Sequence, residues 1–484
     1  MTNRSRREFL ENSMFATAAA VAAGASSQTV LAKDGQSDSP NELLRVAVVG
    51  VRGRGRSHLS AFSGRKDTEV AIICDADEAV GQAQVEEIHK KTGKKPKYVK
   101  DMREAYDDKD IDVVSIATPN HWHALATIWA VQAGKDVYVE KPVSHNVSEG
   151  RRMVQAARKY DKIVQTGTQC RSTKATTEAV EYVQSGQIGD CNFARGLCYK
   201  PRGPIGPAGK YDVPGSVDYD LWTGPAALQP LTRPKLHYDW HWVWNTGNGD
   251  LGNQGIHQMD ICRWGLGATS VGKRVMGFGG RFGYEDAGET ANTEVTFHDY
   301  GDKKVIFEVR GLKTGAECGA KIGVIFYGSN GYVVMTSYNG GAAFDLDGNV
   351  VKKFSGGDDH FGNFVTAVRS RKVSDLNADI EEGHYSSAMC HLGNISMRMG
   401  EMVTAKEAEA RLSDDSELAE TYDRFSSHLR ENGIDLSQNK MHFGPMLEID
   451  PETEEFIGEH ARAANPWLTR EYRKGYEVPS EADL

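Results

Sequence analysis

The amino-acid sequence predicts an α/β protein: an N-terminal doubly wound parallel sheet, followed by an α+β domain with a large mixed or antiparallel sheet. Between residues 43 and 165, short Val- and Ile-rich runs alternate with helix-length segments, as in a sheet whose strands are joined by crossover helices. A glycine-rich turn follows the first run. After Gln165 the alternation stops and strand-like segments cluster. A chain of 484 residues also exceeds one hydrophobic core, so two domains are expected.

Composition narrows the classes of function. The net charge of -10 and the lack of a Lys/Arg run after the N-terminal segment argue against a nucleic-acid-binding surface. The seven cysteines are scattered and form no CxxC pair, so they predict neither a metal site nor a disulfide framework.

The N-terminal segment is typical of an export signal. Ser5-Arg6-Arg7-Glu8-Phe9-Leu10 precedes an apolar run over residues 14–25 that is too short and too weakly apolar to span a membrane. We expect a twin-arginine signal peptide over residues 1–32 and a polar linker over 33–42. Cleavage would follow Ala32 or Ala25, and the alternative is an amphipathic helix that begins with paired arginines. The signal predicts passage through the twin-arginine export machinery, a periplasmic location and no stable membrane insertion.

The first strand–turn–helix unit of the 43–165 domain carries the first binding feature. Residues 44–49 are typical of a buried strand, and a helix-like segment over 58–62 follows the turn that holds Gly50, Gly53 and Gly55. Such a turn lets backbone amides approach a pyrophosphate, which the helix N-terminus also favours. Two arginines, Arg52 and Arg54, lie inside it as further cofactor contacts, and Arg52 occupies a position that is usually glycine.

The next strand ends in a carboxylate. Residues 69–74 form the strand pattern, and Asp75 follows where an acid would hold the ribose hydroxyls of a dinucleotide, with Asp77 as an alternative contact. An acid at this position repels a 2′-phosphate, so NAD is favoured over NADP. Arg52 and Arg54 keep NADP as the alternative.

Two later strand tips carry polar residues. Ligands bind outside the carboxyl ends of parallel strands. The strand over 112–117 leads into Thr118, Asn120 and His123, and the strand over 136–139 leads into Glu140-Lys141-Pro142. Lys141 is therefore expected to project into a ligand crevice. The remaining elements of this domain are helices over 78–91, 124–133 and 147–160, and strands over 98–99 and 162–165.

The second domain is expected over 166–400, with a tail over 401–484 packing on it. Its strand patterns cover 191–199, 294–297, 304–309, 321–326 and 332–337, and helical patterns cover 361–372 and 385–399. Asp347-Gly348 is a predicted hairpin turn, because glycine supplies the positive φ that the turn needs.

A second chemical cluster opens a helix in this domain. Asp250 is a candidate N-cap. Asn253 and His257 are four residues apart and share a helical face. That face can present an imidazole to a substrate hydroxyl beside the amine of Lys141, as a general base. Asp260 either orients His257 or pairs with Arg263.

Aromatic residues just upstream are candidate substrate contacts. Trp240, Trp242 and Trp244 alternate on a segment expected to be extended, which would place them on one face. Such a face either stacks on a sugar ring or fills the core. Arg171 is a further polar candidate for the pocket, with weaker support, as are Gln169, Lys200 and Arg202.

The motifs VAVVGVRGRG, CDAD, ATPNHWH, AGKDVYVEKP and GNGDLGNQGIHQMD together resemble the Gfo/Idh/MocA oxidoreductases. The resemblance implies NAD(P)-dependent chemistry at a carbon of a sugar, sugar derivative or cyclic polyol, and a homo-oligomer. It also implies that Lys141 contacts both nicotinamide and substrate, that Asn120 and His123 line the cofactor ribose, and that Glu140 braces its turn. An aspartate usually stands where this chain has Asn253.

Three functions follow as hypotheses. The first is a periplasmic oxidoreductase whose NAD stays tightly bound, with His257 as acid/base and Lys141 polarising the substrate oxygen. The second is a glycoside hydrolase that uses bound NAD transiently, by oxidation and elimination; relatives of that kind also have an arginine among the glycines of the turn. The third is a non-catalytic sugar-binding protein, which the asparagine at 253 permits.

Overall fold

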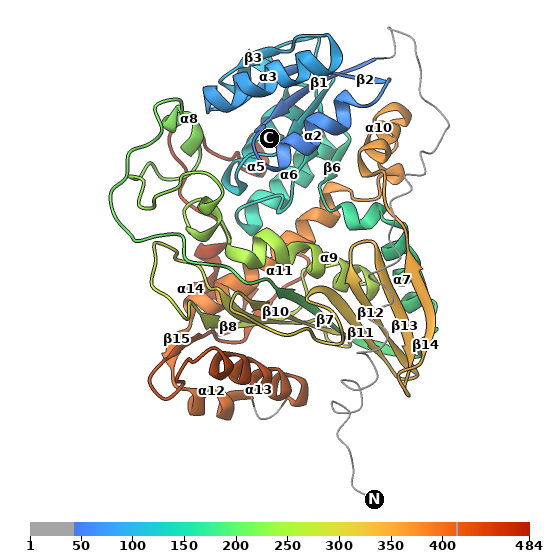
Figure 1. Cartoon of the computed structure of the whole chain (residues 1–484), viewed down its shortest axis with the longest axis vertical. Helices are drawn as coiled ribbons and strands as arrows, with labels where there is room; N and C mark the ends of the chain where they lie inside the picture. The colour runs from blue at the N-terminus through green and yellow to red at the C-terminus, as the bar shows by residue number, and fades with distance from the viewer. Residues whose placement is uncertain (1–42, 413–414) are drawn as a thin grey trace, which may run out of the picture.

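The computed structural model describes residues 43–412 and 415–484. The predicted signal peptide over 1–32 and linker over 33–42 lie outside the described residues. The described chain forms two sheets, one in the N-terminal half and a larger one beyond it, with helices between them (Figure 1). None of the described helices is both long and apolar enough to cross a membrane.

The N-terminal sheet is parallel and has the strand order β3-β2-β1-β4-β5-β6. This is the predicted doubly wound arrangement, and the order reverses between β1 and β4, where α/β sheets bind their ligands. The strands are β1 Leu44–Val49, β2 Thr68–Cys74, β3 Lys97–Val99, β4 Val113–Ile116, β5 Asp136–Val139 and β6 Val164–Thr166.

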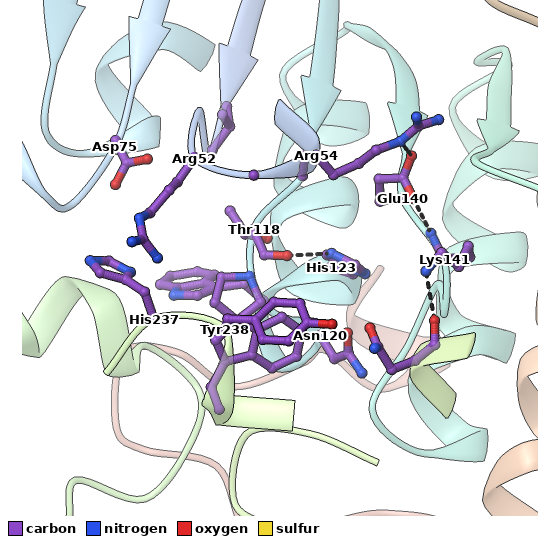
Figure 2. A pocket seen from close by; sticks show the side chains of 18 of the residues that line it. Arg52, Arg54, Asp75, Thr118, Asn120, His123, Glu140, Lys141, His237 and Tyr238 are labelled. Carbon is purple, nitrogen blue, oxygen red and sulfur yellow. Dashed lines mark hydrogen bonds and ion pairs between the residues drawn. The ribbon is translucent and has the colours of Figure 1, made fainter. Parts of the chain in front are cut away.

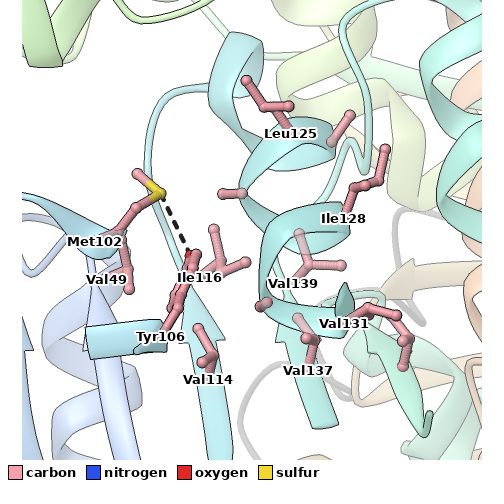
Figure 3. Close-up of a cluster of buried hydrophobic side chains, with 14 of the residues drawn as sticks. Val49, Met102, Tyr106, Val114, Ile116, Leu125, Ile128, Val131, Val137 and Val139 are labelled. Carbon is pink, nitrogen blue, oxygen red and sulfur yellow. Dashed lines mark hydrogen bonds between the residues drawn. The ribbon is translucent and has the colours of Figure 1, made fainter. Parts of the chain in front are cut away.

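One face of this sheet packs against helices of the same domain. Side chains of β4 and β5, among them Ile116 and Val139, meet Leu125 and Ile128 of α5 in a dry core (Figure 3). Continuous apolar strands are expected where both faces of a sheet are covered. The helices of this domain are α2 Arg54–Ser63, α3 Glu78–Thr92, α4 Met102–Tyr106, α5 Asn120–Gln132 and α6 Val147–Lys159. The short helix α4 was not predicted.

The other face is completed by a helix from much later in the chain. Helix α10, His360–Ser370, buries Phe364, Val365 and Val368 in the same cluster as Val46 and Tyr138. The first sheet therefore depends on a segment of the predicted second domain for its core.

The second sheet has twelve strands and is mixed, as predicted. Its main path runs β14-β13-β12-β11-β7-β10-β9-β8-β16-β15, and the β7–β10 pair is parallel. The Asp347-Gly348 turn connects β13 to β14, and Gly348 has φ +82°. The strands are β7 Cys191–Tyr199, β8 Arg274–Gly280, β9 Thr293–Asp299, β10 Lys304–Arg310, β11 Ile322–Gly328, β12 Gly331–Ser337, β13 Gly340–Asp345, β14 Val350–Ser355, β15 Glu401–Val403, β16 Met441–Phe443, β17 Leu447–Ile449 and β18 Phe456–Ile457.

Helices cover both faces of this sheet. Those on the side of the first domain are α7 Lys174–Gln184, α9 Ile256–Gly265 and α11 Ile380–Met399, and α12 Ala405–Leu412 and α13 Ser416–Glu431 lie on the opposite side (Figure 1). The remaining short helical elements are η2 Gln169–Ser172, α8 Tyr219–Thr223, η3 Asp239–Trp242, η4 Leu251–Gly255, η5 Val373–Asp375, α14 Ala461–Ala464, η6 Asn465–Leu468 and η7 Glu481–Asp483.

The C-terminal tail differs in part from the expectation. Its helices and short strands pack on the second sheet, but its last residues return to the first domain (Figure 1). Tyr476 packs edge-on against Trp122 at a centroid distance of 5.6 Å, and the Leu484 carbonyl accepts a hydrogen bond from Tyr160 at 3.2 Å. Apolar rings left open at the edge of α5 and α6 explain this return, since covering them removes apolar surface from water.

Candidate active site

A cavity of about 680 Å³ lies between the two domains, at the carboxyl edge of the parallel sheet. Its walls are the ends of β1, β2, β4 and β5 on one side, and the segments around η3, η4 and the start of α9 on the other (Figure 2). This is the crevice in which doubly wound sheets bind nucleotides.

The glycine turn has the shape that a pyrophosphate site needs. Gly50 has φ +79°, and a Cβ there would lie 2.7 Å from the Thr118 nitrogen. A Cβ on Gly55 would lie 1.9 Å from the Gly50 carbonyl oxygen, whereas Gly53 has φ +52° and open space around it. Gly50 and Gly55 are thus required for close packing of the turn, and Gly53 for its backbone conformation. The turn ends at Gly53, which is the N-cap of α2 and lines the cavity, so the helix N-terminus lies at this site without a side-chain cap.

Asp75 lies at the same end of the cavity. Its carboxylate accepts hydrogen bonds from the backbone nitrogens of Val51 and Asp77, both at 2.9 Å. Burial raises its pKa and these two bonds oppose the rise. Arg52 extends from the glycine turn toward His237 beside it (Figure 2). Asp77 does not line the cavity, because Ser216 and His237 hold its carboxylate at 2.7 and 2.9 Å.

Arg54, predicted as a cofactor contact, lines the cavity and also pairs with a buried carboxylate. Its Nε donates to Glu140 Oε1 at 2.8 Å, and His58 Nε2 lies 3.1 Å from the same oxygen. Burial alone would raise the pKa of Glu140, but Arg54, His58 and Lys141 outweigh it and hold that pKa well below its usual range. A buried carboxylate attracts the guanidinium more strongly than the open cavity does, so Arg54 braces Glu140.

Lys141 projects into the cavity from the tip of β5. Its Nζ donates to the main-chain oxygen of Asn253 at 2.7 Å (Figure 2). Burial lowers the pKa of Lys141, and Arg54 and Lys200 lower it further, against the attraction of Glu140. The amine is therefore held across the domain boundary, at the entrance to α9.

His257 lies in the first turn of α9 and lines the same cavity. Burial lowers its pKa well below the usual value, and the charge of Lys141 adds to this, so the ring is neutral at pH 7. Its Nδ1 is buried and has no hydrogen-bond partner among the described residues. The ring centroid lies 5.1 Å from that of Tyr338. The amine at 141 and the imidazole at 257 therefore meet at one cavity, as the sequence predicted.

The segment before His257 departs from a plain helix. Residues 251–255 form one π-helical turn, η4, a feature that is frequent at functional sites. Within it, Asn253 contributes its main-chain oxygen to Lys141 and lines the cavity. The predicted N-cap Asp250 makes no capping hydrogen bond, because Arg202 engages both of its oxygens, at 2.7 and 2.8 Å.

At the tip of β4, Thr118 and Asn120 differ from His123 in their hydrogen bonds. Thr118 Oγ1 is buried without a partner in the described part of the chain, and Asn120 Nδ2 donates to Asn248 Oδ1 at 3.1 Å. The ring nitrogens of His123 lie 2.6 Å from the Pro142 carbonyl oxygen and 2.8 Å from that of Thr118, and the ring donates to one of them because burial keeps it neutral. His123 also lines the cavity, and its role as a ribose contact stays a prediction.

The predicted aromatic face is not present. Residues 239–242 form a 3₁₀ turn, in which alternate residues point to different sides. Trp240 lines the cavity. Trp242 is buried with Ile205 and Ala287, under the guanidinium of Arg281 at 4.9 Å, and so does not contact this cavity.

The prediction that Arg171 contacts the substrate is also wrong, because Arg171 lies outside the cavity lining. It is buried and donates to Asp260 at 2.9 Å and to Glu382 at 2.9 Å. Asp260 is therefore committed to Arg171 rather than to His257. A buried guanidinium requires such carboxylate partners, and this pair is structural.

Several lining residues carry no signal in the sequence. They come from irregular loops and a distant strand end, and include Trp222, His237, Tyr238, Gln254 and Tyr338. Tyr238 has φ +67°, which is uncommon for a residue other than glycine, and its ring lies across the cavity from Thr118 (Figure 2). Only the fold brings these side chains to Lys141.

Two family models match the chain. Residues 44–168 match the model described as the Gfo/Idh/MocA oxidoreductase family, NAD-binding Rossmann fold. Residues 207–431 match the C-terminal alpha/beta domain of the same oxidoreductase family.

Curated relatives match over part of their length. An alpha-N-acetylgalactosaminidase of Shewanella oneidensis is 33% identical over 177 residues, which are 34% of this chain and 39% of that protein. Glycosyl hydrolase family 109 protein 1 of Shewanella sp. strain ANA-3 is 37% identical over 125 residues, 25% of this chain and 27% of that protein. The match thus spans about two fifths or less of these relatives.

Solved structures with the same fold cover more of the chain. The WlbA dehydrogenase from Bordetella pertussis, in complex with NADH and UDP-GlcNAcA, superposes with a TM-score of 0.54 at 18% identity, covering 72% of this chain and 96% of that one. An NAD binding oxidoreductase from Klebsiella pneumoniae gives 0.54 at 20% identity, covering 73% and 97%. With the two family models on adjacent domains and this shared fold, the chain belongs to the Gfo/Idh/MocA family of oxidoreductases, with an NAD-binding Rossmann domain.

Proposed function

We propose that the protein transfers a hydride between NAD and an alcohol carbon of a sugar, sugar derivative or cyclic polyol. The observation that carries the proposal is the meeting of Lys141 and His257 at a cavity that also contains the glycine turn and Asp75. An amine and a neutral imidazole beside a dinucleotide site are the groups that oxidation of an alcohol requires.

The residues present fit NAD. The crowded turn at Gly50 admits a pyrophosphate against the backbone, and the acceptor-only carboxylate of Asp75 suits ribose hydroxyls. When bound, NAD supplies the hydride acceptor or donor. A 2′-phosphate would face Asp75, so NADP is disfavoured, although Arg52 stands nearby as an attractive partner.

The chain's own residues would handle the proton and the oxygen. Lys141 Nζ donates to the substrate oxygen in place of its bond to Asn253, which holds the amine ready. The neutral imidazole of His257, which lines the cavity, accepts the hydroxyl proton during oxidation and returns it during reduction. A general base of this kind contributes roughly 10²- to 10⁴-fold in rate. The amide of Asn253 hydrogen-bonds but carries no proton.

The test begins with the nucleotide. Purified protein is denatured, any released dinucleotide is identified by mass, and sugars and polyols are screened for its reduction. We expect bound NAD, and at least 100-fold slower turnover in Lys141→Ala and His257→Gln, with Lys94→Ala, whose ammonium pairs with Glu69 on the surface, as control. Protein that neither carries nor binds a dinucleotide at micromolar concentration would refute the proposal. Unchanged turnover in both variants would exclude them as catalytic residues.

A second candidate is glycoside cleavage through transient oxidation and elimination, with no net change in NAD. The similarity to the Shewanella oneidensis alpha-N-acetylgalactosaminidase favours it. The same Lys141 and His257 would act in its oxidation step. Release of a leaving group from a nitrophenyl glycoside without a change in nicotinamide absorbance supports this candidate, and net NADH formation supports the first.

We further propose that residues 1–32 are a twin-arginine signal, that the protein acts in the periplasm with NAD bound throughout turnover, and that it forms a homo-oligomer through the second sheet. The paired Arg6 and Arg7 support the first point. Replacing both with lysine should retain the protein in the cytoplasm, and light scattering of the purified protein measures its oligomeric state.

A further inference from the structure

A second cavity, of about 290 Å³, lies on the far side of Asn248 from the active site. This volume is just below the range for ligand pockets, which is about 300–1,000 Å³. The two cavities share no lining residue, so the second is separate from the dinucleotide site. Its lining comes from the loop after β5, the loop before η4, α11 and the C-terminal tail.

Arg398 is the central feature of this cavity. Its guanidinium lies over two indole rings, with Cζ 4.3 Å from the centroid of Trp244 and 4.4 Å from that of Trp467. The two rings hold the group in place by cation–π contacts. No hydrogen bond or ion pair of Arg398 occurs within residues 43–412 and 415–484, so its N–H donors are open to a ligand. Arg398 as a whole is exposed to solvent, and desolvation by its surroundings lowers its pKa to about 10, so it remains charged at neutral pH.

The charge of Arg398 is not neutralised locally. The one acid that acts on it is Glu289, which does not line the cavity and accepts a hydrogen bond from the Trp244 backbone nitrogen at 2.8 Å. The lining residues of the described chain include no carboxylate. A cation fixed in place without an acid partner favours an external anion.

Further donors converge on the same space. Arg470 also lines the cavity, and its NH1 donates to His145 Nδ1 at 3.2 Å. An imidazole that accepts at Nδ1 while neutral carries its proton at Nε2, and the Nε2 of His145 is buried without a partner in the described structure. Burial keeps His145 neutral by lowering its pKa far below the usual value. Nδ1 of His391 is likewise buried and unpartnered.

We propose that this cavity binds the oxyanion group of a small ligand, such as the carboxylate of a sugar acid, a sulfate or a phosphate. Arg398 supplies a planar pair of charged donors, and Arg470, which also donates to Asn245, adds a second positive charge to the cavity lining. The site adjoins the active site, because Asn248 donates from Nδ2 to the His145 carbonyl oxygen at 3.0 Å and accepts at Oδ1 from Asn120. A ligand in this cavity would therefore bind next to the active site at Lys141, but separately from it.

Direct binding tests the proposal without any measurement of turnover. Sodium sulfate, inorganic phosphate and glucuronate are titrated into the purified mature protein, with glucose as the neutral control, and binding is followed by calorimetry and by the fluorescence of Trp244 and Trp467. We expect saturable binding of at least one oxyanion that depends on Arg398, and no such Arg398-dependent binding of glucose. Tighter binding of glucuronate than of sulfate or phosphate identifies a sugar acid, and the reverse order identifies a free inorganic anion.

Variants assign the binding to this cavity. Arg398→Gln should weaken it at least 10-fold, and Arg398→Lys should weaken it less, because it keeps the charge but loses the planar fork. Arg411→Gln is the matched control, since Arg411 also stacks on an aromatic ring, Phe443, but pairs with Glu401 away from both cavities. The proposal is overturned if none of the three oxyanions binds, or if Arg398→Gln binds them as tightly as the parent protein. Because the readout is binding, loss of the proposed catalytic function would leave this result unaffected.

Discussion

The replacement Glu140→Gln tests the electrostatic support of the active site. The Glu140 side chain is 6% exposed, and its carboxylate accepts hydrogen bonds from Arg54, His58 and the backbone nitrogen of Lys141. Glutamine has nearly the same shape but no charge and only one acceptor oxygen. Arg54 and His58 both lie on Oε1, so an amide oxygen there keeps them without the charge, whereas an amide nitrogen at the position of Oε2 can no longer accept from the backbone nitrogen of Lys141.

The size of the effect follows from burial. His58 is fully buried and cannot turn to water, whereas the Arg54 side chain is 40% exposed and can. Removing one partner of a fully buried ion pair costs about 3–5 kcal/mol, and an unsatisfied buried hydrogen-bonding group about 1–3 kcal/mol. With the exposed arginine partly screened, we expect a loss of about 2–4 kcal/mol in the free energy of unfolding at pH 7.

The effect has a defined pH dependence. The pKa of Glu140 in the folded protein lies well below 4.5, its value in the absence of partners. Its contribution to stability is therefore fully present above about pH 4.5 and is lost as the pH falls through the folded pKa. The difference between parent and variant should be constant near neutral pH and shrink in acid. Because Glu140 raises the pKa of Lys141, the variant should also shift the limb of the pH–rate profile that reports Lys141 to lower pH.

Urea unfolding at several pH values measures this difference, with Glu69→Gln as the control, because Glu69 pairs with Arg45 and Lys94 near the surface of the same domain. The control should lose about 1 kcal/mol or less. If Glu140→Gln is as stable as the control at pH 7 and its pH–rate profile is unmoved, Glu140 does not organise the site and the reasoning is wrong.

Three further predictions concern the turn, a buried ion pair and a buried acid. Gly50→Ala should lose bound nucleotide and about 1–3 kcal/mol of stability or more, because its Cβ meets the Thr118 nitrogen. Gly93 has a similar φ but open surroundings, so thermal melts of Gly93→Ala measure the backbone strain without the clash. Arg171→Met should destabilise the fold by up to about 3–5 kcal/mol, since the buried Asp260 then keeps only the Ser386 hydroxyl and Arg263 at 3.8 Å. A raised KM with unchanged unfolding would instead restore Arg171 to the substrate site. Burial raises the pKa of Glu294 to about 8, so the contribution of its neutral form to stability is fully present below about pH 4.5 and is lost as the pH rises through 8. The free energy of unfolding of Glu294→Gln, relative to the parent protein, should therefore be a few kcal/mol higher at pH 9 than at pH 4. Parallel stability curves for variant and parent would contradict this.

Much of the fold could be predicted because its signals are local. Apolar runs, glycine turns and helix periodicity located all six parallel strands to within about two residues. The short helix α4 and the helix α7 were not predicted, the first because of its length. Strand ends also identified Asp75 and Lys141, since the carboxyl edge of a parallel sheet follows from strand direction alone.

The sequence by itself determined the parallel sheet, the glycine turn, and the presence of an amine and an imidazole suited to one reaction. Only the tertiary structure decided which neighbours each charge would have: Arg54 turns to Glu140, Arg171 to Asp260, and Asn253 offers Lys141 its backbone rather than its side chain. The reason is physical. Backbone conformation depends on residues close in the chain, whereas the partner of a buried charge is whichever opposite charge or dipole the fold brings within about 3 Å, and for Arg54 and Lys141 that partner is many tens of residues away.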